Sequence, residues 1–264
     1  AEGPISKKAG SSFILNYRYS TLGIFNALGI DFGTGSNVPL YQDLNFKVSF
    51  PMSGNGKLSV FGLAGASEID LLGSEADLEN DTDLYGDENQ DAYPRYKTGV
   101  LGASYEKRFG NTFAKMTLGV STASESFSAD SLVRDSNDEV TERYLQGEAE
   151  FDTRKISLVA LLKTKFNSKS SLHYGFYLDL LNFDLYNRDV YANIGSDSVR
   201  VDVNDDATLL QGFATFRHRF SEKFLVQAGL HSQFYSLNEQ VVVEPRLGAQ
   251  YFLTSSQSIS IEIG

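Results

Sequence analysis

Strict alternation of apolar and polar residues is clearest between Tyr41 and Ala66. In the first arm the apolar side chains are Leu44, Phe46, Val48 and Phe50, with Asp43, Asn45, Lys47 and Ser49 between them. Successive side chains of a β-strand point to opposite faces, so this period predicts a strand with one apolar and one polar face. A Pro/Ser/Gly/Asn turn follows, and the alternation resumes from Leu58 to Ala64. The stretch therefore predicts a β-hairpin.

The same alternation recurs along the chain and predicts about eleven strands. They cover residues 12–21, 41–50, 57–66, 97–109, 113–127, 156–163, 172–180, 210–219, 224–234, 241–253 and 259–263. Tight turns are expected near residues 53, 111, 169, 222 and 255. The other connections are long and polar. They cover 68–91, 128–154 and 186–206, and within 128–154 only the later half has a strand-like pattern. The connection after the first strand includes residues 21–30, which have room for one or two helical turns.

Short turns at one rim and long loops at the other are typical of an outer-membrane β-barrel, with the tight rim in the periplasm. We therefore predict an all-β, transmembrane antiparallel β-barrel. A soluble sandwich would show the same alternation, but its connections are short at both ends. Aromatic residues near strand ends fit interfacial girdles, although in a soluble domain they would be core residues: Tyr17, Tyr19, Phe50, Phe109, Phe127, Phe166, Phe220 and Phe252.

Composition agrees with a barrel and excludes several other classes. The 264 residues contain no cysteine, which excludes disulfides and thiolate metal sites. No apolar run approaches the roughly 20 residues of a membrane-spanning helix. The N-terminal residues lack the apolar core of a signal peptide, so we expect that any targeting segment is absent from this sequence.

The acidity of the chain is concentrated in one predicted loop. The net charge is −11, yet residues 68–91 hold ten acidic residues and no Lys or Arg. We predict an extended, solvated and extracellular loop, and this acidity disfavours a nucleic-acid partner. The acidic residues of the predicted loop include Glu75, Asp77, Glu79, Asp81, Asp83, Asp87, Glu88 and Asp91.

Residues 81–91 partly resemble a calcium-binding loop, with oxygen ligands at positions one, three and seven and glycine at six. However, Tyr85 occupies position five, and Ala92 stands where a bidentate glutamate is needed. A solvated acidic loop is the simpler interpretation, so no metal site is predicted.

Catalytic patterns are scarce. His173, His218 and His231 fall on separate predicted strands without ligand spacing, and are expected to be solvated residues of the lumen or rim. Gly33-Thr34-Gly35 lacks the third glycine of a dinucleotide site, and no Gly-x-Ser-x-Gly elbow occurs. We therefore predict that the protein is not an enzyme and needs no cofactor.

The predicted strand count suggests that the chain is one part of a larger barrel. An odd number of strands does not close the usual even-numbered bacterial barrel, and a free edge in lipid leaves backbone groups unpaired at several kcal/mol each. We expect residues 1–264 to form a partial outer-membrane barrel domain, with the remaining strands elsewhere.

Four short motifs carry a family resemblance across essentially the whole chain. They are Glu2-Gly3-Pro4, Asn16-Tyr17-Arg18-Tyr19-Ser20-Thr21, residues 41–47 (YQDLNFK) and Glu244-Pro245-Arg246-Leu247-Gly248. In order and spacing the chain resembles the barrel of TonB-dependent outer-membrane receptors, in particular the Bacteroidota type. That resemblance implies a 22-stranded barrel around an N-terminal plug, importing scarce nutrients with energy relayed by TonB. This sequence shows neither plug nor TonB box, which leaves the coupling machinery outside it.

The implied function is TonB-dependent active import of a nutrient across the cell outer membrane; the alternative is a passive porin-like or structural barrel within a surface assembly. Expected partners are outer-membrane lipids, the plug and remaining strands, TonB through the plug, and a surface lipoprotein. Leu44, Phe46, Val48, Leu158, Ala160, Val226 and Ala228 are expected to face lipid. The residues expected to face the lumen are Asn16, Arg18, Asp43, Asn45, Lys47, Gln227, Glu244 and Arg246, together with Lys155. The substrate is not indicated.

Overall fold

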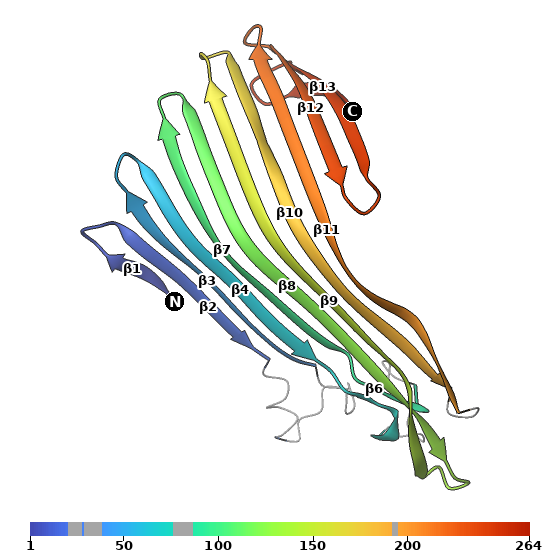
Figure 1. Cartoon of the computed structure of the whole chain (residues 1–264). Helices are drawn as coiled ribbons and strands as arrows, with labels where there is room; N and C mark the ends of the chain where they lie inside the picture. Colours follow the sequence, from blue (N-terminus) through green and yellow to red (C-terminus); the bar gives the residue numbers. More distant parts are fainter. Residues whose placement is uncertain (21–27, 29–38, 76–86, 192–194) are drawn as a thin grey trace.

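A computed structural model describes residues 1–20, 28, 39–75, 87–191 and 195–264. The described residues form one tilted, curved antiparallel sheet with a single short helical turn (Figure 1). Twelve strands follow one another in chain order: β1 (Glu2–Ser6), β2 (Ser11–Tyr19), β3 (Leu40–Met52), β4 (Gly56–Glu68), β7 (Arg95–Phe109), β8 (Thr112–Arg134), β9 (Val140–Lys165), β10 (Ser170–Tyr191), β11 (Ser196–Arg219), β12 (Phe224–Tyr235), β13 (Gln240–Phe252) and β14 (Ser258–Ile263). The short β5 (Leu71–Leu72), η1 (Gly73–Glu75) and β6 (Gln90–Ala92) lie between β4 and β7.

The registers align the apolar residues of neighbouring strands on one face. Leu15 lies opposite Phe46, Phe46 opposite Gly62, and Gly62 opposite Leu101. The row continues across the sheet without a change of face, and directly opposed residues share a face. We call this row the apolar belt. Its members are Leu15, Leu44, Phe46, Val48, Val60, Leu101, Met116, Leu118, Val120, Ile156, Leu158, Ala160, Phe176, Leu178, Leu180, Leu210, Ala214, Val226, Ala228, Leu230, Leu247, Ala249, Ile261 and Ile263.

No second layer covers the belt within the described residues. Leu118 is 56% exposed and Leu247 54% exposed, and only five small or mid-sized apolar residues are buried, at Ala92, Ala129, Leu132, Ala207 and Leu225. A continuous apolar surface of this extent marks contact with a membrane or another protein. The sheet therefore lacks the interior core of a soluble β-sandwich.

No helix in the described part of the chain is long and apolar enough to cross a membrane.

Tight turns join β3 to β4, β7 to β8, β9 to β10 and β11 to β12 at one rim (Figure 1), and residues 236–239 form a further short turn between β12 and β13 at the opposite end of these strands. Gly54 and Asn55 both adopt positive φ, 68° and 61°, as required by the hairpin turn whose twist matches its strands. In the turn between β9 and β10, Asn167 Oδ1 accepts hydrogen bonds from the backbone N–H groups of Lys169 and Ser170, at 2.8 Å each. Polar side chains thus close these turns locally. The predicted turns near residues 53, 111, 169, 222 and 255 are confirmed.

At the opposite rim the long connection predicted for 186–206 was wrong, and so was the earlier half of the one predicted for 128–154, whose later half is strand as its pattern indicated. The segment 128–154 is almost entirely strand, because β8 continues to Arg134 and β9 begins at Val140. Likewise β10 extends to Tyr191 and β11 begins at Ser196, within the connection predicted for 186–206. Both strand pairs project well beyond the belt (Figure 1). In this projecting rim neither face has to be apolar, so the alternation that marks a strand is lost.

Further corrections concern the N-terminus and the girdles. The first strand, β1, had not been predicted, since Gly and Pro interrupt its five residues. Phe127 and Phe252 lie on the polar face rather than beside the belt, because each is one position out of phase with it. The helical turns predicted within 21–30 lie outside the described residues.

Candidate functional site on the polar face

The face opposite the belt carries the charged residues of the wall. The registers place all eight predicted lumen-facing residues on this one face, and Lys155 with them. Serine, threonine and glycine occupy some positions between them, and large apolar side chains such as Phe113, Phe151 and Phe213 occupy others. The seven residues predicted to face lipid all lie on the opposite face, in the apolar belt, according to the same registers. That this face lines a lumen stays a prediction.

One charged cluster lies on β2 and β3. The Arg18 guanidinium donates to Asp43 Oδ2 at 2.6 Å, and Asn45 Nδ2 donates to Asp43 Oδ1 at 3.4 Å. The cluster follows from the register, which sets Arg18 opposite Asp43 and Asn16 opposite Asn45. Lys47, two residues farther along β3, lies opposite Phe61. The arrangement neutralises Asp43 and leaves hydrogen-bond donors of Arg18 exposed to the space in front of the sheet.

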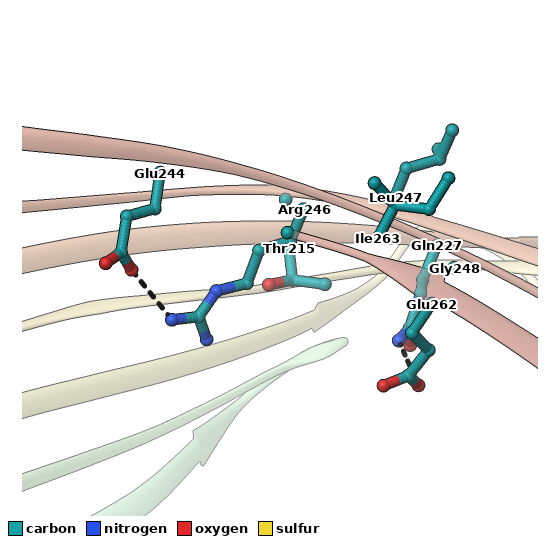
Figure 2. A pocket seen from close by; sticks show the side chains of 10 residues that line it. Thr215, Gln227, Glu244, Arg246, Leu247, Gly248, Glu262 and Ile263 are labelled. Atoms are coloured by element: carbon teal, nitrogen blue, oxygen red, sulfur yellow. Dashed lines mark hydrogen bonds and ion pairs between the residues drawn. The ribbon is translucent and has the colours of Figure 1, made fainter.

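A second cluster surrounds a hollow of ≈ 570 Å³ on β11 to β14 (Figure 2). Glu244 Oε2 accepts hydrogen bonds from Arg246 at 2.9 Å and from His231 Nδ1 at 3.0 Å. Gln227 Nε2 donates to Glu262 Oε1 at 3.4 Å across the hollow from Glu244 and Arg246. One carboxylate thus holds two donors in place. The hollow presents amide, guanidinium and carboxylate groups suited to hydrogen-bond a polar partner.

The two clusters share a face but not a site. Arg18 and Asp43 lie near the β1 edge of the sheet, whereas Glu244 and Arg246 lie near the β14 edge. Within the described ranges no group of three or more His, Asp or Glu residues is arranged to hold a metal ion. Ion pairs hold the charged side chains within each of the two clusters.

Ion pairs also organise the projecting rim. Arg188 bridges Glu148 at 2.8 Å and Asp197 at 3.4 Å, and Arg200 is hydrogen-bonded to Asp189. Glu148 raises the pKa of Arg188, and the bond to Asp189 raises the pKa of Arg200, so both guanidinium groups stay charged. Asp189 and Arg200 also line a hollow of ≈ 530 Å³, with Phe127, Tyr144 and Tyr191 among the other residues around it.

The acidic segment is partly built into this rim. Asp91, expected in a solvated loop, is instead fully buried in β6, where its Oδ1 accepts from the Ser74 N–H at 2.9 Å and its Oδ2 faces Arg143 at 2.9 Å. Arg134 donates to the carbonyls of Gly73 and Glu88, at 2.7 and 3.0 Å. A buried carboxylate and an arginine therefore fasten both ends of the segment to β8 and β9.

Other acidic residues of the segment have simpler surroundings. Glu75 ends η1, and Asp87 Oδ1 accepts from the Asn89 N–H at 2.9 Å. Next to β6, the pKa of Tyr93 is raised, first by burial and then by the charges of Asp91 and Asp130. Asp77, Glu79, Asp81 and Asp83 lie outside the described residues.

Sequence reasoning missed the partners that fix these charges. His231 and Glu262 complete the second cluster, although the histidines had been expected to be solvated. The spacing of Glu244 and Arg246 indicates a pair on one face, but His231 reaches Glu244 only through the β12–β13 register. Arg134 and Arg143 gave no signal, because their partners Gly73, Glu88 and Asp91 lie in a distant part of the sequence.

Comparison with known proteins supports the fold. No protein-family model matches the sequence, and none of the curated proteins matches it. Solved outer-membrane structures do match: Pseudomonas aeruginosa FpvA bound to pyoverdines (TM-score 0.68, 13% identity, covering 99% of this chain and 39% of that one), the siderophore receptor PirA from Acinetobacter baumannii (0.60, 14%, 96% and 38%) and the outer membrane transporter YddB from Escherichia coli (0.63, 10%, 99% and 36%).

At these identities the likeness establishes the fold alone. The chain folds like a stretch of barrel wall and covers 38% of the length of PirA. The predicted all-β, antiparallel barrel-type sheet is confirmed. In the described residues β1 pairs only with β2 and β14 only with β13, so the sheet is open.

Proposed function

We propose that this chain is part of the wall of an outer-membrane barrel that imports a nutrient by TonB-dependent active transport. The observation that carries the proposal is the apolar belt, which keeps its phase through eleven neighbouring strands opposite a charged face. In a barrel that spans a membrane, lipid-facing and lumen-facing residues must alternate in this way. The folds of PirA and YddB, whose names describe a siderophore receptor and an outer membrane transporter, support the same interpretation.

The proposed assembly is larger than the chain. Residues 1–264 supply a partial barrel domain, and the remaining strands and a plug complete it, in keeping with the length of FpvA and PirA. The plug contacts the Arg18–Asp43 and Glu244–Arg246 clusters and is engaged by TonB from the periplasm. A surface lipoprotein is a candidate partner on the outside, and a Bacteroidota-type receptor is the subfamily indicated by the motifs.

We propose a ferric siderophore as the first substrate class to test, since FpvA was solved with pyoverdines and PirA is named a siderophore receptor. The acidic segment and the projecting rim would face the outside. Ten carboxylates within 68–91 favour approach of cationic or metal-bearing ligands over anionic ones. Arg188 and Arg200, held by their carboxylate partners, are two of the fixed cations of the projecting rim.

Uptake measurements test the transport proposal. In host cells carrying the whole protein, accumulation of radioactive iron from a ferric siderophore should fall to background when TonB is deleted. The amount of protein in the outer membrane should stay unchanged. Persistent, non-saturating uptake without TonB would reject energy coupling and favour the passive pore.

Cysteine labelling tests which face meets lipid, and residues 1–264 contain no native cysteine that would compete for the reagent. Phe46→Cys should be unreactive toward a membrane-impermeant maleimide in intact membranes, because it lies in the belt. Lys47→Cys, the adjacent residue, should react once the plug is released with urea. Labelling of Phe46→Cys but not Lys47→Cys would overturn the assignment of faces.

A further inference from the structure

The tight-turn rim is strongly basic, opposite in sign to the projecting rim. Segments 7–10, 51–57, 106–112, 163–170, 217–224 and 252–258 form this basic rim and carry a net charge of +9. The described segments of the other rim, 68–75, 87–91, 126–150, 182–191 and 195–206, carry −15. The only acidic residues of the basic rim are Glu106 and Glu222. Its cations are Lys7, Lys8, Lys57, Lys107, Arg108, Lys163, Lys165, Lys169, Arg217, Arg219 and Lys223.

A row of rings follows the basic rim on the belt side of the sheet. Phe166 lies 6.4 Å from Phe216, which stacks 6.3 Å from His218, and His218 meets Phe220 edge-on at 4.5 Å. Phe224 continues the row 5.8 Å beyond Phe220. Phe220 is 59% exposed, so the rings are not covered by protein. Aromatic rows of this kind lie at the boundary between hydrocarbon and water.

Exposed cations accompany these rings. Lys169 and Lys223 lie in the two turns that the aromatic row connects, and both are exposed. Lys107 faces the belt side and places its Nζ 5.2 Å from the ring centre of Phe109. Within the described residues none of these three ammonium groups forms an ion pair with the protein. Each therefore has its charge free for an external anion at the level of the rings.

We propose that the basic rim binds the phosphate headgroups of anionic phospholipids and so fixes which way the barrel faces. The proposal rests on the proposed function, because it requires the belt to lie in a bilayer. Headgroup phosphates lie directly beyond the hydrocarbon, where the free lysines are, and each nearby cation gains attraction to an anionic surface. Tight turns face the periplasm in such barrels, and the leaflet there is made of phospholipid. The −15 charge of the described residues at the other rim repels the same headgroups.

Lipid selectivity tests the proposal. The whole protein is reconstituted in phosphatidylcholine bilayers containing a spin-labelled phosphatidylglycerol or a spin-labelled phosphatidylcholine, and the immobilised fraction of each is measured. Wild type should prefer phosphatidylglycerol. The Lys107→Gln/Lys169→Gln/Lys223→Gln variant should lose about fivefold of that preference for each lysine that contacts a headgroup. Added salt should weaken the wild-type preference.

A matched variant removes three lysines from the polar face instead. Lys47→Gln/Lys115→Gln/Lys155→Gln changes the net charge equally but should keep the wild-type preference, since these positions face away from lipid. Equal losses in the two variants would reject the basic rim as the binding surface. So would a wild-type barrel without preference for phosphatidylglycerol, or one whose labelled lipid is displaced more readily by lipopolysaccharide than by phosphatidylglycerol.

Assembly is checked separately in every sample by the shift in gel mobility on heating. Failure of the wild type to assemble in bilayers would count against the barrel proposal itself. An assembled barrel without lipid preference would contradict only the headgroup site.

Discussion

Replacing Leu118 by arginine is expected to destabilise the assembled protein by about 2–4 kcal/mol, the cost of a cation on the lipid face near the middle of a bilayer. Leu118 lies in the belt on β8, between Ala103 of β7 and Leu158 of β9, and is 56% exposed in the sheet alone. In water, an exposed leucine could become arginine at little cost. The sign and size of the change therefore report what surrounds the belt. Urea unfolding from lipid vesicles measures it.

Thr117→Arg is the matched control, one residue earlier and on the polar face. Its side chain points toward the proposed lumen, so its effect should be much smaller than that of Leu118→Arg. If Leu118→Arg were as stable as wild type in vesicles, the belt would not contact lipid.

Gly175→Ala is expected to cost about 1–3 kcal/mol, as overpacking typically does. A Cβ at this position on β10 would lie 2.2 Å from the backbone oxygen of Ala160 and 3.1 Å from Leu161 Cδ2. A carbonyl within a strand cannot turn aside as a side chain can, so β9 and β10 would have to separate locally. The free energy of unfolding should drop, and hydrogen exchange should rise in β9 and β10.

Gly212→Ala, on the adjacent strand β11, provides the comparison. Nothing lies within 4 Å of a Cβ built there. Its effect should be close to zero or slightly stabilising, because alanine restricts the unfolded chain more than glycine does. Equal losses at the two glycines would mean that strand propensity, rather than the contact with Ala160, decides the cost.

The sequence was sufficient for the belt and its phase. Leu44, Phe46 and Val48 on one face, with Asp43, Asn45 and Lys47 on the other, follow from a period of two and need no tertiary information. The turns at 53 and 111 were equally readable, since Gly54 and Gly110 supply the positive φ that such turns need. Local sequence rules therefore identify a strand wherever one of its faces must be apolar.

Beyond the belt those rules fail for a physical reason. At the end of β8 beyond Phe127, and at the start of β11, water can reach both faces, so no alternation survives to mark a strand. Asp91 was misplaced for a related reason: ten acidic residues within the 24 residues of 68–91 indicate a solvated loop, whereas burial of one of them depends on Arg143 from another strand. Only the registers of β6 on β8 and of β8 on β9 bring these two partners together.

The register shifts of the sheet lie where they leave the belt unaffected. Those in β8–β9 fall at Ala129/Asp130 and Val133/Arg134, the one in β10–β11 at Asn187/Arg188, and the one in β1–β2 next to a tight turn. A bulge exchanges the faces of all later residues in its strand. Each of these shifts lies outside the belt. Insertion or deletion of a residue in the projecting rim would therefore change the side chains that an arriving ligand meets, and every residue of the belt would keep its face. The outer rim can thus change its recognition surface during evolution while the membrane-facing pattern stays fixed.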